Sequence, residues 1–170
     1  MNYFICPVCK SEFTRNNNSY ICENNHCFDI SKKGTVNLLR SNKSSHGDDK
    51  LMVNARRNFL DKGYYLPLLE ILKKQLYSVA QNKYTILDCG ECWYTANLYK
   101  HLEDNGIESD FYGIDVSKEA ILAGASRNRN LRLAVGTVFD IPLPDKSCDI
   151  ILSLFAPFSH SEYIRLLKEF

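Results

Sequence analysis

Four potential metal ligands within the first 27 residues constrain the fold of this chain more than any other feature. Their spacing is Cys6-x2-Cys9-x12-Cys22-x3-His26. Two thiolates two residues apart fit a tight turn that binds one side of a tetrahedral Zn²⁺, and a second pair on a later turn closes the site. About 30 residues cannot bury a useful core alone, so we expect the metal to supply much of the folding free energy.

The residues around these positions fit a small ribbon closed by the metal. Segment 15–19 is polar and turn-rich, as in a hairpin. His26 and Cys27 are adjacent, so either could supply the fourth ligand; we expect His26, with Cys27 as a small buried hydrophobic side chain. Because protein then fills all four positions, the metal is expected to be structural. The alternative is a small domain with free thiols.

Composition and charge exclude several classes of protein. The seven cysteines are an odd number and the N-terminus lacks a secretion-signal pattern, so we expect a reducing compartment, the cytoplasm. No run of about 18 apolar residues is present, which argues against a transmembrane helix. The net charge of +1 excludes a globally basic nucleic-acid binder. However, the charge is unevenly distributed. Residues 1–62 carry ten Lys/Arg and six Asp/Glu, a net charge of +4, and residues 63–170 carry eleven Lys/Arg and fourteen Asp/Glu, a net charge of −3. This asymmetry favours two modules with different partners.

The rest of the chain changes from helical patterning to an alternation of strands and helices. A polar linker at 41–50 precedes expected helices over 51–61 and from Pro67 onward. The alternation after residue 82 predicts a parallel sheet covered by helices. We therefore divide the chain into a zinc module (1–40), a linker with helices covering the cofactor site (41–82) and an α/β domain (83–170). The expected strands are 84–88, 111–115, 131–135 and 148–154, and the expected helices are 96–103, 118–126 and 161–170.

A candidate cofactor site follows the first two of these strands. Parallel sheets bind ligands at the carboxyl ends of their strands, where Asp88, Gly90 and Asp115 lie. An acid in the position of Asp115 can accept hydrogen bonds from ribose hydroxyls, as NAD or S-adenosylmethionine requires. The turn has a single glycine, which disfavours a pyrophosphate and hence NAD. Two alternatives stay open: the acids could merely cap strand ends, and Cys89 with Cys92 could form a thioredoxin-like redox pair.

At this point the chain resembles a known family, the bacterial 23S rRNA (guanine-N1)-methyltransferases, which join a zinc-binding module to a class I methyltransferase domain. The fold class that follows is α/β, with an N-terminal zinc-ribbon-like module followed by the first half of a class I (Rossmann-like) methyltransferase sheet. The segments that carry the resemblance are Cys6-Pro-Val-Cys9, Tyr20-Ile-Cys22, His26, Phe28-Asp29, 33–39, Ala55-Arg56-Arg57, Phe59-Leu60-Asp61, Gly63, Tyr65, Leu87-Asp88, Gly90-Glu91, Tyr94-Thr95, 113–117 and Ala156-Pro157.

The resemblance implies a structural zinc ion and an S-adenosylmethionine site. Zinc would be bound by Cys6, Cys9, Cys22 and His26. Tyr65 and the Gly90-Glu91 turn would contact the cofactor beside Asp88, and Asp115 would bind its ribose. The implied reaction transfers a methyl group to N1 of a guanine in a 23S rRNA hairpin.

The resemblance also suggests how such an RNA would be held. The basic side chains of the zinc module would contact its phosphates. The target base would have to leave its stack, and Phe155 or Phe158 would stack on it unless both are core aromatics. The basic side chains in question are Lys10, Arg15, Lys32, Lys33 and Arg40.

Two departures from the family pattern bear on activity. The loop after the first strand lacks two residues, and Cys92 replaces a glycine, which is costly if the turn requires a positive φ there. Only four of seven strands are expected, which would leave the apolar strand 148–154 at a sheet edge. We therefore expect one of three situations. The chain could be a fragment, or it could be a C-terminally truncated, catalytically inactive remnant that binds RNA and depends on zinc. Alternatively, a partner copy in a homodimer could complete the sheet.

Overall fold

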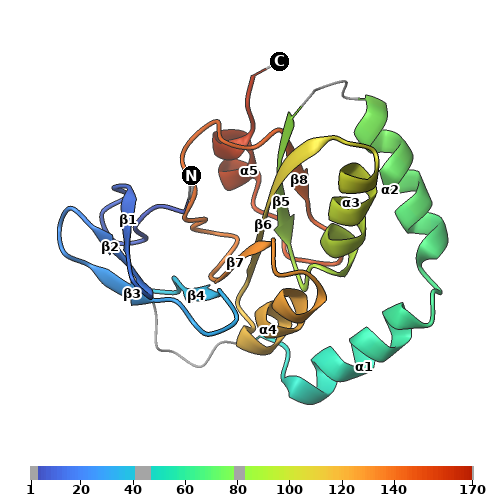
Figure 1. Cartoon of the computed structure of the whole chain (residues 1–170), viewed down its shortest axis with the longest axis horizontal. Coiled ribbons are helices and arrows are strands. Elements are labelled where there is room, and N and C mark those ends of the chain that lie inside the picture. Colours follow the sequence, from blue (N-terminus) through green and yellow to red (C-terminus); the bar gives the residue numbers. More distant parts are fainter. Residues whose placement is uncertain (1–3, 41–46, 79–82, 170) are drawn as a thin grey trace.

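The computed structural model describes residues 4–40, 47–78 and 83–169, which form two sheets (Figure 1). The first is an antiparallel ribbon of β1 (Phe13–Asn16), β2 (Ser19–Cys22) and β3 (Cys27–Asp29). The second is parallel, in the order β4-β7-β6-β5-β8. Its strands are β4 (Val36–Asn37), β5 (Lys83–Cys89), β6 (Glu108–Asp115), β7 (Arg132–Val135) and β8 (Ile150–Leu152).

Helices cover both faces of the parallel sheet (Figure 1). One face carries α3 (Trp93–Asp104) and α4 (Lys118–Arg127), with α2 (Leu66–Ser78) packed on α3 and α1 (Lys50–Asp61) packed on α4. The other face carries α5 (His160–Leu166). Two apolar layers result, because the strand side chains alternate between the faces: Ile86 and Phe111 lie in one layer, Leu87 and Tyr112 in the other. The predicted α/β fold with a parallel sheet is confirmed.

The ribbon is attached to the parallel sheet by β4, a strand that the sequence pattern did not reveal. Val36 and Asn37 pair with Ala134 and Val135 of β7 in parallel register. The ring of Phe4 also packs edge-on against Tyr112 of β6 at 5.3 Å. The residues after the ribbon therefore serve as the sheet's outermost strand beside β7, and the domain bounds given above remain a prediction.

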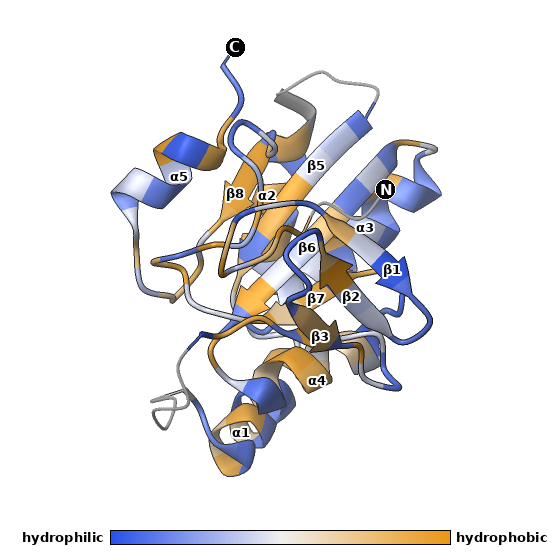
Figure 2. Cartoon of the chain, turned by 90° about the vertical axis from the view of Figure 1, so that its left-hand side faces the viewer, coloured by the Kyte–Doolittle hydropathy of each residue, from blue (hydrophilic) through white to orange (hydrophobic). Residues whose placement is uncertain are grey.

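Several element ends differ from the sequence-based expectation. Helix α3 begins at Trp93 rather than at residue 96, and α5 ends at Leu166. Strand β8 covers only 150–152, because Cys148 instead bridges to Leu167 beyond α5. Within the described chain β8 forms one edge of the sheet, as expected, and Figure 2 colours it hydrophobic, in contrast to the hydrophilic β1.

Candidate functional site: a metal cluster and a cleft

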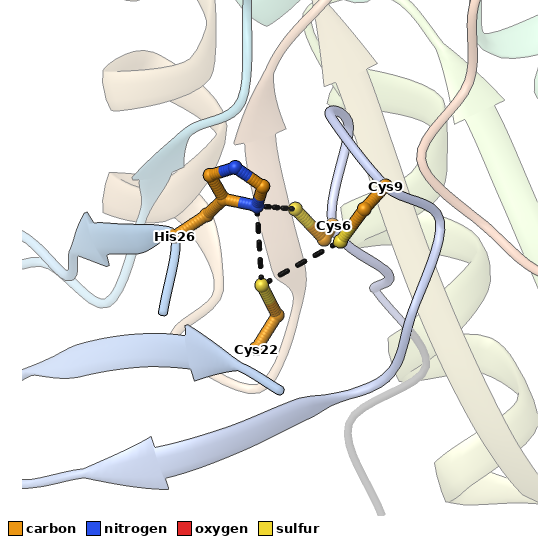
Figure 3. Close-up of side chains that lie close together, drawn as sticks. All are labelled: Cys6, Cys9, Cys22 and His26. Carbon is orange, nitrogen blue, oxygen red and sulfur yellow. Dashed lines mark hydrogen bonds between the residues drawn. The ribbon is translucent and has the colours of Figure 1, made fainter. Parts of the chain in front are cut away.

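The four predicted metal ligands converge at one end of the ribbon (Figure 3). Their ligand atoms all lie within 4.8 Å of one another. The Nδ1 atom of His26 is 3.5 Å from Cys6 Sγ and 3.3 Å from Cys22 Sγ, and the Sγ atoms of Cys9 and Cys22 are 3.6 Å apart. The predicted set is thus brought together from the first turn and from the loop between β2 and β3.

These distances fit a tetrahedral zinc ion. With Zn–S bonds of about 2.3 Å and Zn–N bonds of about 2.0 Å, tetrahedral geometry separates neighbouring ligand atoms by about 3.5–3.8 Å. Hydrogen bonds from Asn24 and Ser11 lower the pKa of the Cys9 thiol to about 5, which favours the thiolate that a metal requires. Three thiols and one imidazole form a closed donor set, consistent with a structural role.

Cys27 does not behave as expected. We predicted a small buried side chain, but Cys27 is exposed. It is the first residue of β3, where it pairs with Ile21, and the alternation of the strand turns Cys27 outward and Phe28 toward the apolar side. That part of the prediction is wrong, while the choice of His26 as the fourth ligand agrees with the geometry.

A second candidate site is a cleft of about 400 Å³ at the carboxyl ends of β5, β6 and β8. Segments far apart in the sequence form its wall: the residues before α1, the C-terminal half of α1, the α1–α2 connection, the β5–α3 turn and the residues after β6 and β8. All five residues predicted to bind the cofactor line it, namely Tyr65, Asp88, Gly90, Glu91 and Asp115.

Asp88 is the most deeply buried acid in this cleft. It lies near the carboxyl end of the buried strand β5, and its carboxylate accepts a hydrogen bond from the Thr95 hydroxyl on α3. Burial raises the pKa of Asp88 to about 7, and the neighbouring carboxylates of Asp115 and Glu91 act in the same direction. A cation in the cleft would relieve this repulsion.

Glu91 lacks the hydrogen bonds that a buried carboxylate normally accepts. Its side chain is 6% exposed, and both of its oxygens lack a hydrogen-bond donor among the described residues. Its nearest cation is Arg56 of α1, with Nη1 at 3.5 Å from Oε2. The buried hydroxyl of Tyr94, which also lines the cleft, has no hydrogen-bond partner among the described residues either. The cleft therefore contains polar atoms that a ligand could satisfy.

Asp115 ends β6 at the other side of the cleft. One of its oxygens accepts a hydrogen bond from the backbone N–H of Ser117 at 2.7 Å, which orients the carboxylate at the start of α4. Burial raises the pKa of Asp115 as well. Its place in the cleft wall at the end of β6 suits the predicted ribose contact.

Cys92 adopts the backbone conformation that the shortened loop raised as a concern. It precedes α3 with φ of 63° and ψ of 26°, in the left-handed region that favours glycine. Its thiol fills the space beside Gly113 of β6, where any Cβ would overlap the sulfur. Burial raises the pKa of Cys92 well above its ordinary value and that of Cys89 to about 12. A redox pair needs an accessible, acidified thiol, so the thioredoxin-like alternative is wrong.

Aromatic side chains surround the mouth of the cleft. Phe155 is 79% exposed, has a φ of 58°, and meets the ring of Tyr65 edge-on at 5.6 Å. Tyr65 in turn contacts Phe59 of α1 at 5.6 Å. Phe158 is 66% exposed, so neither it nor Phe155 is a core residue. A bulky residue at positive φ is strained, and such strain clusters at functional sites.

Comparisons with known proteins identify the family. A family model described as "Methyltransferase domain" matches residues 86–170, and one described as "RlmA, N-terminal", a zinc ribbon, matches residues 4–46. The chain belongs to the methyltransferase family. A 23S rRNA (guanine(748)-N(1))-methyltransferase from Streptomyces fradiae is 31% identical over 99% of this chain and 60% of its own length. The protein YxjB of Bacillus subtilis, named for 23S rRNA (guanine-N1) methylation, is 33% identical over 97% of this chain and 60% of its own length.

The solved structures agree with this methyltransferase fold. A SAM-dependent methyltransferase from Aquifex aeolicus matches with a TM-score of 0.52 and 23% identity over 71% of this chain and 68% of that one. The predicted resemblance to the 23S rRNA (guanine-N1)-methyltransferases, the class I fold and the zinc ribbon are thus confirmed. The chain spans about 60% of the length of these curated relatives.

The five basic residues named for the zinc module are all exposed, but some of them already contact other side chains. Lys10 and Arg40 both pair with Asp140, which ties the ribbon to the loop after β7. Lys33 donates a hydrogen bond to the Ser126 hydroxyl of α4 at 2.8 Å. Arg15 and Lys32 are exposed as well, and the Nε–H of Arg15 donates a hydrogen bond to the backbone carbonyl of Asn17 at 3.3 Å.

Sequence reasoning missed Arg56, Tyr94 and Phe59 as members of the cleft. All three lie in segments that carried the family resemblance, but the resemblance supplied no individual role for them. Spacing alone could not reveal them, because Arg56 and Phe59 lie on α1, Tyr94 lies on α3, and the fold brings these separate helices to one cleft. Within the described chain, no helix is long and apolar enough to cross a membrane.

Proposed function

We propose that this chain binds S-adenosylmethionine in the cleft and transfers its methyl group to N1 of a guanine in a 23S rRNA hairpin. The observation that carries the proposal is the convergence of Tyr65, Asp88, Gly90, Glu91 and Asp115 on one cleft at the carboxyl ends of the strands. The names of the relatives support the substrate class, and a cytoplasmic location follows from it.

The charge of the cleft supports this choice of cofactor. Asp88 and Glu91 are buried acids, Asp115 is a half-buried one, and Arg56 is the cation beside them in the cleft wall. S-adenosylmethionine has a sulfonium and an ammonium group against one carboxylate, a net charge opposite to that of the cleft. A pyrophosphate would be repelled, so the NAD alternative is disfavoured on charge as well as on glycine content.

Each residue has a distinct task in this proposal. Asp115 would accept hydrogen bonds from the ribose hydroxyls, and Gly90 allows close approach of the ligand to the β5–α3 turn. The bound cofactor supplies an activated methyl group. The methyl group would pass to N1 of guanine, and the uncharged thioether of the cofactor would be the leaving group. Positioning of the two reactants is therefore the main contribution of these side chains.

The RNA side of the proposal rests on the ribbon and the aromatic mouth. Arg15 and Lys32 would contact phosphates, and the exposed ring of Phe155, beside Tyr65, would stack on the base that enters the cleft. The zinc cluster would hold the ribbon in shape for this contact. The N1 proton of guanine would also be released during the transfer.

Methyl transfer to unmodified 23S rRNA tests the proposal. Zinc-loaded protein and cofactor with a labelled methyl group should label the RNA at a guanine that stops reverse transcription, because N1 lies on the pairing edge. Asp115→Asn should lower the labelling strongly, while Asp104→Asn, an exposed acid at the end of α3, should not. Cofactor binding without labelling of any rRNA would instead support an inactive RNA-binding remnant.

A further inference from the structure

The cleft contains a pair of opposite charges, Arg56 and Glu91, in which the Glu91 carboxylate accepts no hydrogen bond among the described residues. Glu91 is buried with both carboxylate oxygens unpartnered by hydrogen bonds, and Arg56 lies 3.5 Å away. The side chain of Arg56 is 44% exposed and lines the cleft, so a ligand there can reach it. It also pairs with Asp48, but a guanidinium has five donor hydrogens and can serve two carboxylates at once.

We infer that Arg56 and Glu91 together bind the amino-acid end of the cofactor, Arg56 taking its α-carboxylate and Glu91 its α-ammonium. The inference rests on the proposed function and adds Arg56 as a residue that positions the cofactor. An α-amino acid presents a carboxylate and an ammonium group on one carbon, and the Arg56–Glu91 pair presents their complements side by side.

Other ligands fit this pair less well. An RNA phosphate could meet Arg56, but the buried carboxylate of Glu91 directly beside it would repel the phosphate. A metal cation could meet Glu91, but Arg56 would repel the cation. A zwitterionic group is complementary to both side chains. Its ammonium group would donate the hydrogen bonds that the buried oxygens of Glu91 lack.

Two ligands that differ only at this end provide the test. S-adenosylhomocysteine carries the amino-acid end, and 5′-methylthioadenosine lacks it. Calorimetry with the zinc-loaded full chain should show that Arg56→Ala weakens S-adenosylhomocysteine binding about tenfold to a hundredfold, the range of a charged hydrogen-bonded contact. Binding of 5′-methylthioadenosine should change less than about twofold, because it makes no contact with the pair.

Arg57→Ala provides the matched control. Arg57 is adjacent, similarly exposed and paired with Asp61 instead, so its removal should leave both affinities unchanged. Glu91→Gln should reduce the preference for S-adenosylhomocysteine, as Arg56→Ala does. An Arg56→Ala variant that loses both ligands equally, or neither, overturns the inference while leaving the proposed function intact. A wild-type chain that binds neither ligand overturns both.

Discussion

Asp88→Asn should stabilise the protein at neutral pH, although Asp88 lies in the proposed binding site. Burial and the carboxylates of Asp115 and Glu91 raise the pKa of Asp88 from 3.8 to about 7. A carboxyl whose folded-state pKa is raised makes the folded state less stable as pH rises between the two values, because the unfolded state gives up its proton first. An amide stays neutral and can still accept the hydrogen bond from Thr95.

The magnitude follows from the two pKa values. At pH 5.5 ionisation of Asp88 in the unfolded state costs the wild type about 2 kcal/mol of stability, and at pH 8 the net cost is about 4 kcal/mol. The difference in unfolding free energy between Asp88→Asn and wild type should therefore grow by about 2 kcal/mol over this interval. Titrating groups that do not interact with Asp88 cancel in the difference.

Urea denaturation at several pH values between 5.5 and 8 measures this difference. A difference that is flat with pH would refute the reasoning, since it would mean that Asp88 is ionised in the folded state throughout. The same substitution should weaken S-adenosylmethionine binding at pH 8, because it removes a negative charge from the cleft proposed to bind this cationic cofactor. Wild-type affinity should rise as pH increases through 7, with release of a proton on binding.

Three further changes test other parts of the structure. Cys9→Ser should lose the zinc ion and unfold the ribbon, as measured by metal analysis and circular dichroism. Cys27→Ser, which changes an exposed thiol outside the ligand set, should keep one zinc ion per chain. Retention of zinc by Cys9→Ser would disprove the site. Gly113→Ala should cost about 1–3 kcal/mol in urea denaturation through overlap with Cys92, and a neutral effect would contradict that packing. Phe155→Ala should reduce rRNA methylation while leaving cofactor affinity unchanged, and an equal loss of both would argue against base stacking.

The ribbon and the cleft acids could be predicted because chemistry fixes their local spacing. Tetrahedral zinc requires paired ligands on tight turns, so Cys6, Cys9, Cys22 and His26 were identifiable from sequence alone. Likewise, parallel strands bring their carboxyl ends to one edge, which predicted that Asp115 and the β5–α3 turn would share a cleft.

Features that depend on contacts between distant segments were not predictable. Strand β4 is only two residues long, and its partner β7 lies about a hundred residues later, so no local periodicity marks it. Arg56 reaches Glu91 only because α1 packs on α4. The outward direction of Cys27 depends on the register of β3 against β2, which a run of three residues does not define.

Titration of zinc-loaded protein with S-adenosylmethionine in a calorimeter tests the central claim most directly. The claim is that the cleft formed by the β5–α3 turn and Asp115 is a working cofactor site despite the left-handed backbone at Cys92. We predict binding of one cofactor per chain, an increase in melting temperature with cofactor, and loss of both in Asp115→Asn. Absence of binding heat and of any thermal shift in the wild-type chain would contradict the claim.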